Sequence, residues 1–222
     1  MDNHIRPAAS VVLLKPSSEG FDTLLLQRSE QLSFAPGHWV FPGGKIEEFD
    51  YRDGDGEVDA AYHAARRECL EEAGIDGLGE LYYLATWTGP TSARYRFRTH
   101  LFVAFVAPDT SLTVDGSEIV SGHWISLPEA WKRASAGEYK MMPPTIVSLH
   151  DLQAHNTPAS MRDFLHDRPY FDYVPKVVRY EGGMVALYPG DSGWHQGAMT
   201  EDAPFHRLLL IDNKTYRFVK TD

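Results

Sequence analysis

Runs of apolar residues predict that the chain begins with β-strands. Ala8–Lys15 and Asp22–Arg28 are rich in valine and leucine, and the segment between them, Pro16–Gly20, contains proline, serine and glycine. This composition favours a turn, so the two strands are expected to form a hairpin. A shorter strand, His38–Phe41, runs directly into the turn sequence Pro42-Gly43-Gly44.

Helical spacing of small and apolar residues then predicts a central helix, Val58–Ala73, with Gly74 as its left-handed C-terminal cap. Strand-like and helix-like segments alternate after it, and from residue 174 the pattern returns to strands, the last two joined by a hairpin turn at 212–214. The further predicted strands are Leu81–Thr88, Tyr95–Ala107, Glu118–Ser126, Val174–Tyr180, Met184–Tyr188, His206–Ile211 and Tyr216–Val219, and the further predicted helices are Leu127–Ser135, Pro144–His155 and Pro158–His166.

This order of elements predicts an α/β fold in which helices pack on a mixed β-sheet. We expect residues 1–156 to form the main domain. Residues 157–222 are expected to form a C-terminal extension of helices and strands packed on the same domain. Two roles for the extension stay open from the sequence: it covers a substrate cleft, or it forms the contact of a homodimer.

Composition and charge narrow the function classes. The 222 residues are 43% hydrophobic and 23% charged, which is typical of a soluble globular protein. The strongest apolar run, Leu101–Ala107, is too short for a membrane span, and the first residues lack the features of an export signal, so we expect a cytoplasmic protein without a membrane partner. The single cysteine, Cys69, fits this location. The net charge of −10 argues against nucleic acid as a partner but allows a small anionic substrate bridged by a divalent cation.

Three glutamates form the most informative cluster. Glu68, Glu71 and Glu72 stand at positions i, i+3 and i+4 near the end of the predicted central helix, so they share one face. Like charges at this spacing repel by roughly 0.2–0.5 kcal/mol per pair, and the helix dipole disfavours anions in the last turn. A solvated acidic face is the simpler alternative. A bound Mg²⁺ or Mn²⁺ would relieve the repulsion, because hard cations prefer oxygen ligands.

The segment that carries these acids resembles the end of the Nudix box, G-x5-E-x7-R-E-U-x-E-E-x-G-U, where U is a bulky aliphatic residue. The turn Pro42-Gly43-Gly44 is similar to its start. The resemblance implies an α/β/α sandwich and a metal-dependent hydrolase that cleaves a nucleoside-diphosphate-linked substrate. It further implies that Glu68, Glu71 and Glu72 are metal ligands or bases and that the Gly44 carbonyl is a ligand. Two interpretations of Arg67 stay open from the sequence: it orients Glu68, or it is a surface cation. The matching positions are Arg67, Glu68, Glu71, Glu72, Gly74 and Ile75, with Cys69 in place of an aliphatic residue.

The box is interrupted in this chain. It places 13 residues between its glycine and its arginine, whereas 22 residues separate Gly44 from Arg67. Counting back from Arg67 puts Asp59 in the slot of the first glutamate, with Glu57 and Glu47 as alternatives. Family members often recruit a further acid from a later loop, and Glu118 is the candidate here. The competing interpretation of Glu118 is an ordinary hairpin acid.

A second resemblance concerns the substrate. The stretch from Leu24 through Gly44 is similar to the extra motif of coenzyme A diphosphatases, with Leu26 in place of a threonine and Ser33 in place of an arginine. It implies coenzyme A or an acyl-coenzyme A as substrate, with Arg28 and Phe41 as substrate-binding candidates. Arg96 and Arg98 are further candidates, because Arg96–Phe102 resembles the R-F-D-T-x-F-F strand of peroxisomal coenzyme A diphosphatases. The alternatives are an ADP-ribose or dinucleotide pyrophosphatase, or a non-catalytic ligand sensor with the same fold.

Overall fold

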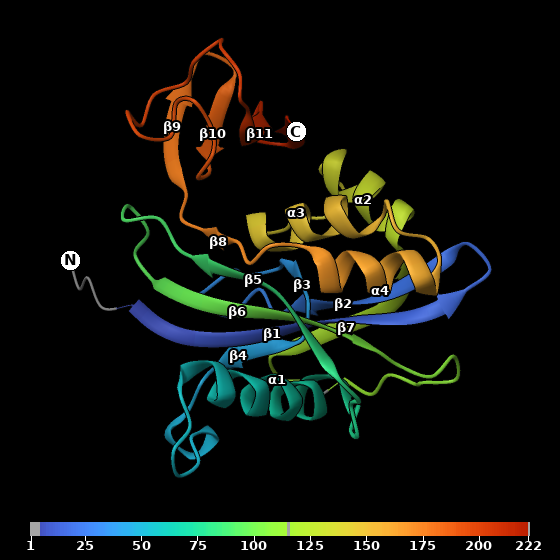
Figure 1. The fold of residues 1–222 in the computed structure, drawn as a ribbon. Helices are drawn as coiled ribbons and strands as arrows, with labels where there is room; N and C mark the ends of the chain where they lie inside the picture. Colours follow the sequence, from blue (N-terminus) through green and yellow to red (C-terminus); the bar gives the residue numbers. More distant parts are fainter. Residues whose placement is uncertain (1–4, 115, 222) are drawn as a thin grey trace.

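The computed structural model describes residues 5–114 and 116–221. Its main feature is a mixed sheet of eight strands in the order β3-β2-β1-β6-β5-β8, with β4 paired to β1 and β7 paired to β2 (Figure 1). The strands are β1 (Ile5–Ser17), β2 (Gly20–Arg28), β3 (Trp39–Val40), β4 (Gly43–Lys45), β5 (Leu81–Thr88), β6 (Arg96–Phe105), β7 (Ile119–Ser126) and β8 (Asp172–Tyr173).

The strand pairing confirms the predicted mixed sheet. β1 and β2 form the expected antiparallel hairpin, while β1 and β6 run parallel through the middle of the sheet. Both central strands are strongly apolar, as expected for strands covered on two faces. β4 and β8 were missed by the sequence analysis because strands of two or three residues show no periodicity.

Helices cover both faces of this sheet. α1 (Glu57–Ala73) lies on one face, and α2 (Leu127–Ser135), α3 (Pro143–Leu152) and α4 (Pro158–Asp167) lie on the other (Figure 1). The α/β/α sandwich is therefore confirmed. α1 sits close to the sheet because the side chains that face it are alanines: Ala60, Ala61, Ala64 and Ala65 are fully buried in one core cluster with Val11 and Leu13. Gly74 ends α1 in the left-handed conformation (φ 66°), as predicted.

The C-terminal part of the chain adds a second sheet. Its strand order is β12-β11-β10-β9, all antiparallel. β8, which leads into it, pairs with β5 of the first sheet, and the larger core cluster contains residues of both sheets, such as Val12 and Leu208. The domain boundary at residue 156 stays a prediction. The strands are β9 (Lys176–Tyr180), β10 (Gly183–Leu187), β11 (His206–Ile211) and β12 (Thr215–Lys220).

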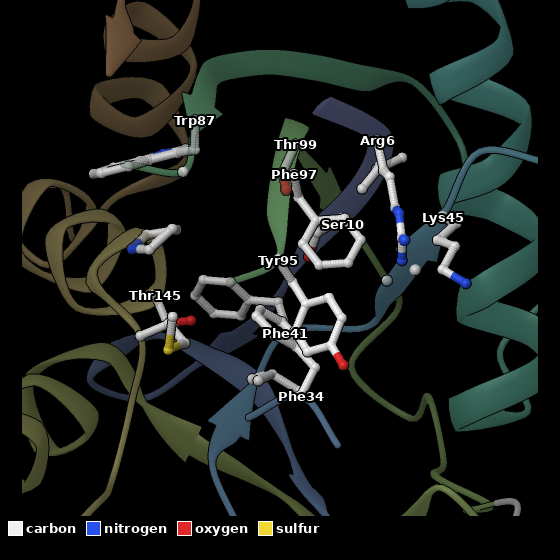
Figure 2. A pocket seen from close by; sticks show the side chains of 18 of the residues that line it. Arg6, Ser10, Phe34, Phe41, Lys45, Trp87, Tyr95, Phe97, Thr99 and Thr145 are labelled. Atoms are coloured by element: carbon white, nitrogen blue, oxygen red, sulfur yellow. The ribbon is translucent and has the colours of Figure 1, made fainter. Parts of the chain in front are cut away.

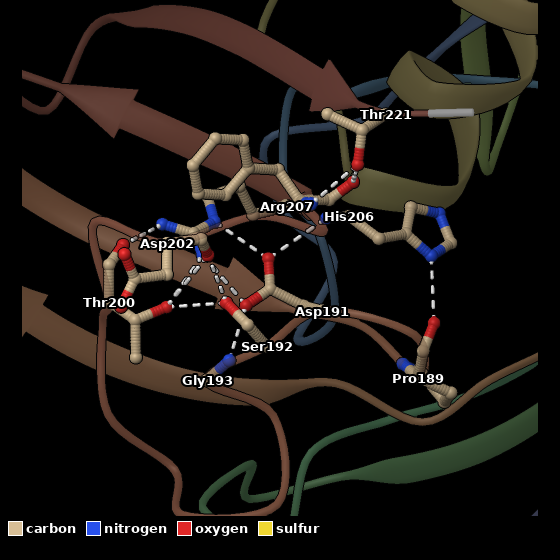
Figure 3. A network of polar contacts seen from close by, with 10 residues as sticks. Pro189, Asp191, Ser192, Gly193, Thr200, Asp202, His206, Arg207 and Thr221 are labelled. Carbon is tan, nitrogen blue, oxygen red and sulfur yellow. Dashed lines mark hydrogen bonds and ion pairs between the residues drawn. The ribbon is translucent and has the colours of Figure 1, made fainter.

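A buried ion pair holds the long loop between β10 and β11. Asp191 accepts hydrogen bonds from Nε (2.7 Å) and Nη2 (2.8 Å) of Arg207, and both side chains are buried (Figure 3). The same carboxylate accepts bonds from the backbone N–H groups of His206 and Gly193, each at 2.9 Å. One charged group thereby fixes both ends of the loop.

We predict that Asp191→Ala destabilises the protein by about 3–5 kcal/mol, because Arg207 is left charged and unpaired in the interior. The free energy of unfolding in urea is the measurement. Arg217→Ala, at an exposed position of the neighbouring strand, is the control and should change it by at most about 0.5 kcal/mol. A loss below about 1 kcal/mol for Asp191→Ala would contradict the structural role of the pair.

Candidate active site at the end of helix α1

Arg67 organises the acidic end of α1. Its Nε and Nη2 donate to the two carboxylate oxygens of Asp50 at 3.1 and 2.8 Å, and Nη1 donates to Glu68 (2.8 Å) and Glu71 (2.9 Å). Burial alone would raise the pKa of Asp50, but the hydrogen bonds from Arg67 outweigh it and the pKa is lowered. The guanidinium therefore screens two of the three neighbouring glutamates from each other and anchors them to the loop before the helix.

Asp50 is the site residue that sequence analysis missed. It ends the short 3-10 helix η1 (Glu48–Asp50) and is the sixth residue after Gly44, which is the spacing of the first box glutamate counted from the glycine. None of the three acids considered in the sequence contacts Arg67 in this way. Counting forward from Gly44 would have identified Asp50; the extra residues lie after it. Glu57 instead pairs with Arg98 and His100, Asp59 accepts from the Gly56 N–H at the start of α1, and the Glu47 N–H donates to Asp50.

Glu68 and Glu72 face the glycine turn. Glu72 is 7% exposed, and its Oε2 accepts a hydrogen bond of 2.9 Å from the Gly43 N–H. Glu68 packs so closely on Gly44 that a Cβ atom there would lie 2.3 Å from its Oε1. A side chain at position 44 would therefore displace the Glu68 carboxylate from its present position. The antiparallel pairing of β4 with β1 holds the turn against the helix.

Burial sets the electrostatics of these two glutamates. Desolvation raises the pKa of Glu72 to about 8, and the neighbouring Glu68 charge adds to the effect. Desolvation also raises the pKa of Glu68, against the opposing influence of Arg67. Without a cation, both carboxyl groups therefore hold a proton more tightly than an exposed glutamate does. Raised pKa values of this kind are expected for buried carboxyl groups that bind a cation.

The donor set fits a divalent metal ion in its chemistry. All candidate ligands are oxygen atoms: the carboxylates of Glu68, Glu71 and Glu72 and the Gly44 carbonyl. Within the described residues, however, no three acidic, histidine or cysteine side chains are already spaced to hold an ion. Glu71, 56% exposed, points to Arg67, so side-chain rotation on binding would be needed to complete the set.

A cavity of about 920 Å³ opens beside these acids, within the size range of sites for small ligands. Arg28 and Glu118 lie in its wall, with 3.9 Å between Nη2 and Oε2, and Phe41 lines it together with other aromatic residues (Figure 2). The cavity thus brings together Glu68, Glu71, Glu72, Arg67, Gly44, Arg28, Phe41 and Glu118.

Arg96 and Arg98 are not brought to this cavity. Phe97 and Thr99 of β6 line it, and alternate residues of a strand point to opposite faces. Arg98 instead pairs with Glu57 at 3.1 Å, and Nε of Arg96 donates to the Gly89 carbonyl. Sequence analysis did not anticipate the lining residues Arg6, Phe34 and Lys45, since they belong to no local motif.

Residues 4–144 match the NUDIX domain family. The chain belongs to this family. Its members generally use divalent metal ions, which agrees with the oxygen-only donor set at the end of α1. Within the described parts of the chain, no helix combines the length and apolar character needed to cross a membrane.

Three relatives illustrate the similarity. The Caenorhabditis elegans protein named "Putative nudix hydrolase 7" is 27% identical over 180 residues, covering 65% of this chain; the chain spans 59% of that protein's length. A NUDIX hydrolase structure from Alicyclobacillus acidocaldarius has a TM-score of 0.66 at 20% identity, over 75% of this chain and 97% of that one. The NUDIX domain of Shewanella oneidensis NrtR in complex with ADP ribose has a TM-score of 0.52 at 18% identity, over 68% and 86%. The two structures support the Nudix fold.

We predict that Asp50→Asn lowers the free energy of unfolding by about 1.5–3 kcal/mol, because Arg67 loses the charged partner to which both Nε and Nη2 donate. Asp53→Asn, at an exposed position of the same loop, is the matched control and should be nearly neutral. Chemical denaturation of both variants measures the difference. Equal stabilities of the two variants would show that the Asp50–Arg67 pair does not hold the loop.

We also predict that the metal-free protein loses stability as the pH rises. The folded-state pKa of Glu72, about 8, lies above the ordinary value of 4.5, so the folded state binds this proton more tightly. The resulting stabilisation is complete below pH 4.5 and disappears as the pH rises through about 8. Urea unfolding in EDTA between pH 5 and 9 measures the trend. Glu72→Gln should flatten it, and an unaltered trend in this variant would assign the pH dependence to other groups.

Proposed function

We propose that the chain is a hydrolase that cleaves the diphosphate bond of a nucleoside-diphosphate-linked substrate and depends on Mg²⁺ or Mn²⁺. Coenzyme A or an acyl-coenzyme A is the first candidate substrate. The observation that carries the proposal is that one cavity combines the acids of α1 with Arg28 and with a group of aromatic side chains. This combination suits a molecule with a charged diphosphate and an aromatic base.

Glu68, Glu71, Glu72 and the Gly44 carbonyl would hold the ion. When bound, it would neutralise the diphosphate and lower the pKa of an attacking water. Arg28, whose side chain is only 15% exposed, offers a guanidinium for two hydrogen bonds to one phosphate group. Arg67, which donates to Glu68 at 2.8 Å, would keep that carboxylate in place.

Hydrolysis requires a proton acceptor for the water that attacks phosphorus. As the new O–P bond forms and the bridging P–O bond breaks, the proton passes to a carboxylate, and the leaving group departs as a phosphate. Glu72, buried beside Glu68, and Glu118, across the cavity next to Arg28, are the two candidates. Both acids line the cavity, so either can act as the general base.

The aromatic residues would bind the base. Phe34 and Phe97 lie with their ring centroids 5.0 Å apart, and Phe41 and Tyr95 line the same part of the cavity (Figure 2). Stacking of a base on such rings contributes about 1–3 kcal/mol. Stacking does not discriminate strongly among bases. Specificity therefore depends mainly on the group attached to the other side of the diphosphate.

The motif similarity favours coenzyme A, and the two departures from the motif affect this assignment to different degrees. Leu26, in place of the threonine, is fully buried in the core and lies away from the cavity, so the change is compatible with function. Ser33, in place of the arginine, does line the cavity and removes one cation from its wall. ADP-ribose is the second candidate, because a NUDIX domain of similar fold was solved in complex with ADP ribose.

We predict that the chain hydrolyses coenzyme A in the presence of Mg²⁺ or Mn²⁺, and that Glu72→Gln lowers kcat by at least about a hundredfold without unfolding the protein, because a ligand or base is lost. A panel of coenzyme A, ADP-ribose and a diadenosine polyphosphate, analysed for nucleotide products, is the assay. Asp76→Asn, on an exposed acid just beyond α1, is the control. Tight binding of a panel member without turnover of any would support a ligand sensor instead.

A further inference from the structure

The C-terminal sheet forms one end of the cavity. Val177 on β9 and Ala186 on β10 are paired neighbours, and both line it together with Pro175. Thr145, at the start of α3, lies in the same lining and is 5% exposed. All four residues lie beyond residues 4–144, the part of the chain that matches the NUDIX domain. The cavity is therefore completed by elements outside the family domain.

The lining changes in character along the cavity. Figure 2 shows Arg6 and Lys45 beside α1, the rings of Phe34, Phe41, Tyr95 and Phe97 in the middle, and Trp87 and Thr145 at the side away from α1. The lining residues in and next to the start of α3 and the strands β9 and β10 carry no charge and are mainly aliphatic: Met142, Pro143, Pro144, Thr145, Pro175, Val177 and Ala186. A phosphate group has no charged partner among them.

We propose that this end of the cavity binds an uncharged arm with aliphatic segments that is attached to the diphosphate on the side opposite the nucleoside. This inference rests on the proposed function and deepens it: the substrate class is a nucleoside diphosphate linked to a long flexible chain, such as the pantetheine arm of coenzyme A. The C-terminal sheet then determines substrate specificity. Val177 and Ala186 are its specificity-determining residues.

Two other occupants fit the lining less well. A base needs a free aromatic face, but Trp87, the ring at this end, is only 5% exposed and has one face stacked on Tyr173, with centroids 3.8 Å apart and an interplanar angle of 4°. A sugar carries a hydroxyl group on most of its carbons and needs partners for them, since unpaired polar groups are costly to bury, whereas the two amides and the hydroxyl of a pantetheine arm are separated by aliphatic segments. Among the lining residues that α3 and the C-terminal sheet contribute, Thr145 carries the polar side chain. Apolar contacts with an aliphatic chain suit this wall instead.

A matched pair of substrates tests the assignment. Dephospho-coenzyme A and ADP-ribose share the ADP half and differ in the attached group, so only the first carries the long arm. Val177→Trp fills the end of the cavity, and because Val177 is 38% exposed the larger ring can be accommodated without unfolding. We expect the ratio of kcat/KM for dephospho-coenzyme A to kcat/KM for ADP-ribose to fall at least tenfold.

The control places the same ring outside the cavity. Arg179 is exposed, lies two residues along β9 on the same face as Val177, and does not line the cavity, so Arg179→Trp should keep the ratio. An unchanged ratio in Val177→Trp, or an equal loss with both substrates, would overturn the assignment. An equal loss would mean that the end of the cavity binds the shared ADP half.

Binding of free pantetheine gives a readout that needs no turnover. We expect saturation-transfer NMR signals from pantetheine with the unmodified chain and with Glu72→Gln, and their loss with Val177→Trp. If pantetheine binds but no diphosphate is hydrolysed, the arm site stands and the proposed function fails. If diphosphates are hydrolysed but pantetheine does not bind, or still binds to the Val177→Trp variant, the arm site is refuted and the function stands.

Discussion

The electrostatic constraint on which the site depends is the crowding of carboxylates at the end of α1. Arg67 makes it tolerable: one guanidinium contacts Asp50, Glu68 and Glu71 and ties the helix to the loop before it. Glu72 is buried, and desolvation raises its pKa despite the hydrogen bond from Gly43 and the nearby charge of Arg28. A divalent cation would therefore balance the negative charge that these carboxylates bring together.

Close packing of backbone elements makes this arrangement possible. Alanines on α1 let the helix lie directly on the sheet, and the absence of a side chain at Gly44 leaves room for the Glu68 carboxylate. The hydrogen bond from Gly43 to Glu72 then fixes the turn against the last part of the helix. The small residues at these contacts matter for the chemistry of the site, because they allow the backbone carbonyl of Gly44 to lie near the acids.

The rest of the chain contributes to the site through the cavity wall. The Nudix domain provides the acids, Arg28 and the aromatic rings, whereas Val177 and Ala186 come from a sheet that the family match does not include. β8 pairs with β5 and brings this sheet to the edge of the domain. A conserved type of fold can thereby acquire its own specificity from an added element, without any change at the acids.

Local patterns in the sequence determined the helix that carries Glu68, Glu71 and Glu72, its cap at Gly74, and most strands, because each depends on residues a few positions apart. The tertiary structure decided what depends on residues far apart in the chain. The length of the loop after Asp50 concealed its pairing with Arg67, and strand register turned Phe97 to the cavity and Arg98 toward Glu57. Lining residues such as Arg6 and Phe34 come together only when the strands of the sheet pair. Side chains of a strand alternate between the two faces of the sheet, so the pairing of distant strands decides which of them line the cavity.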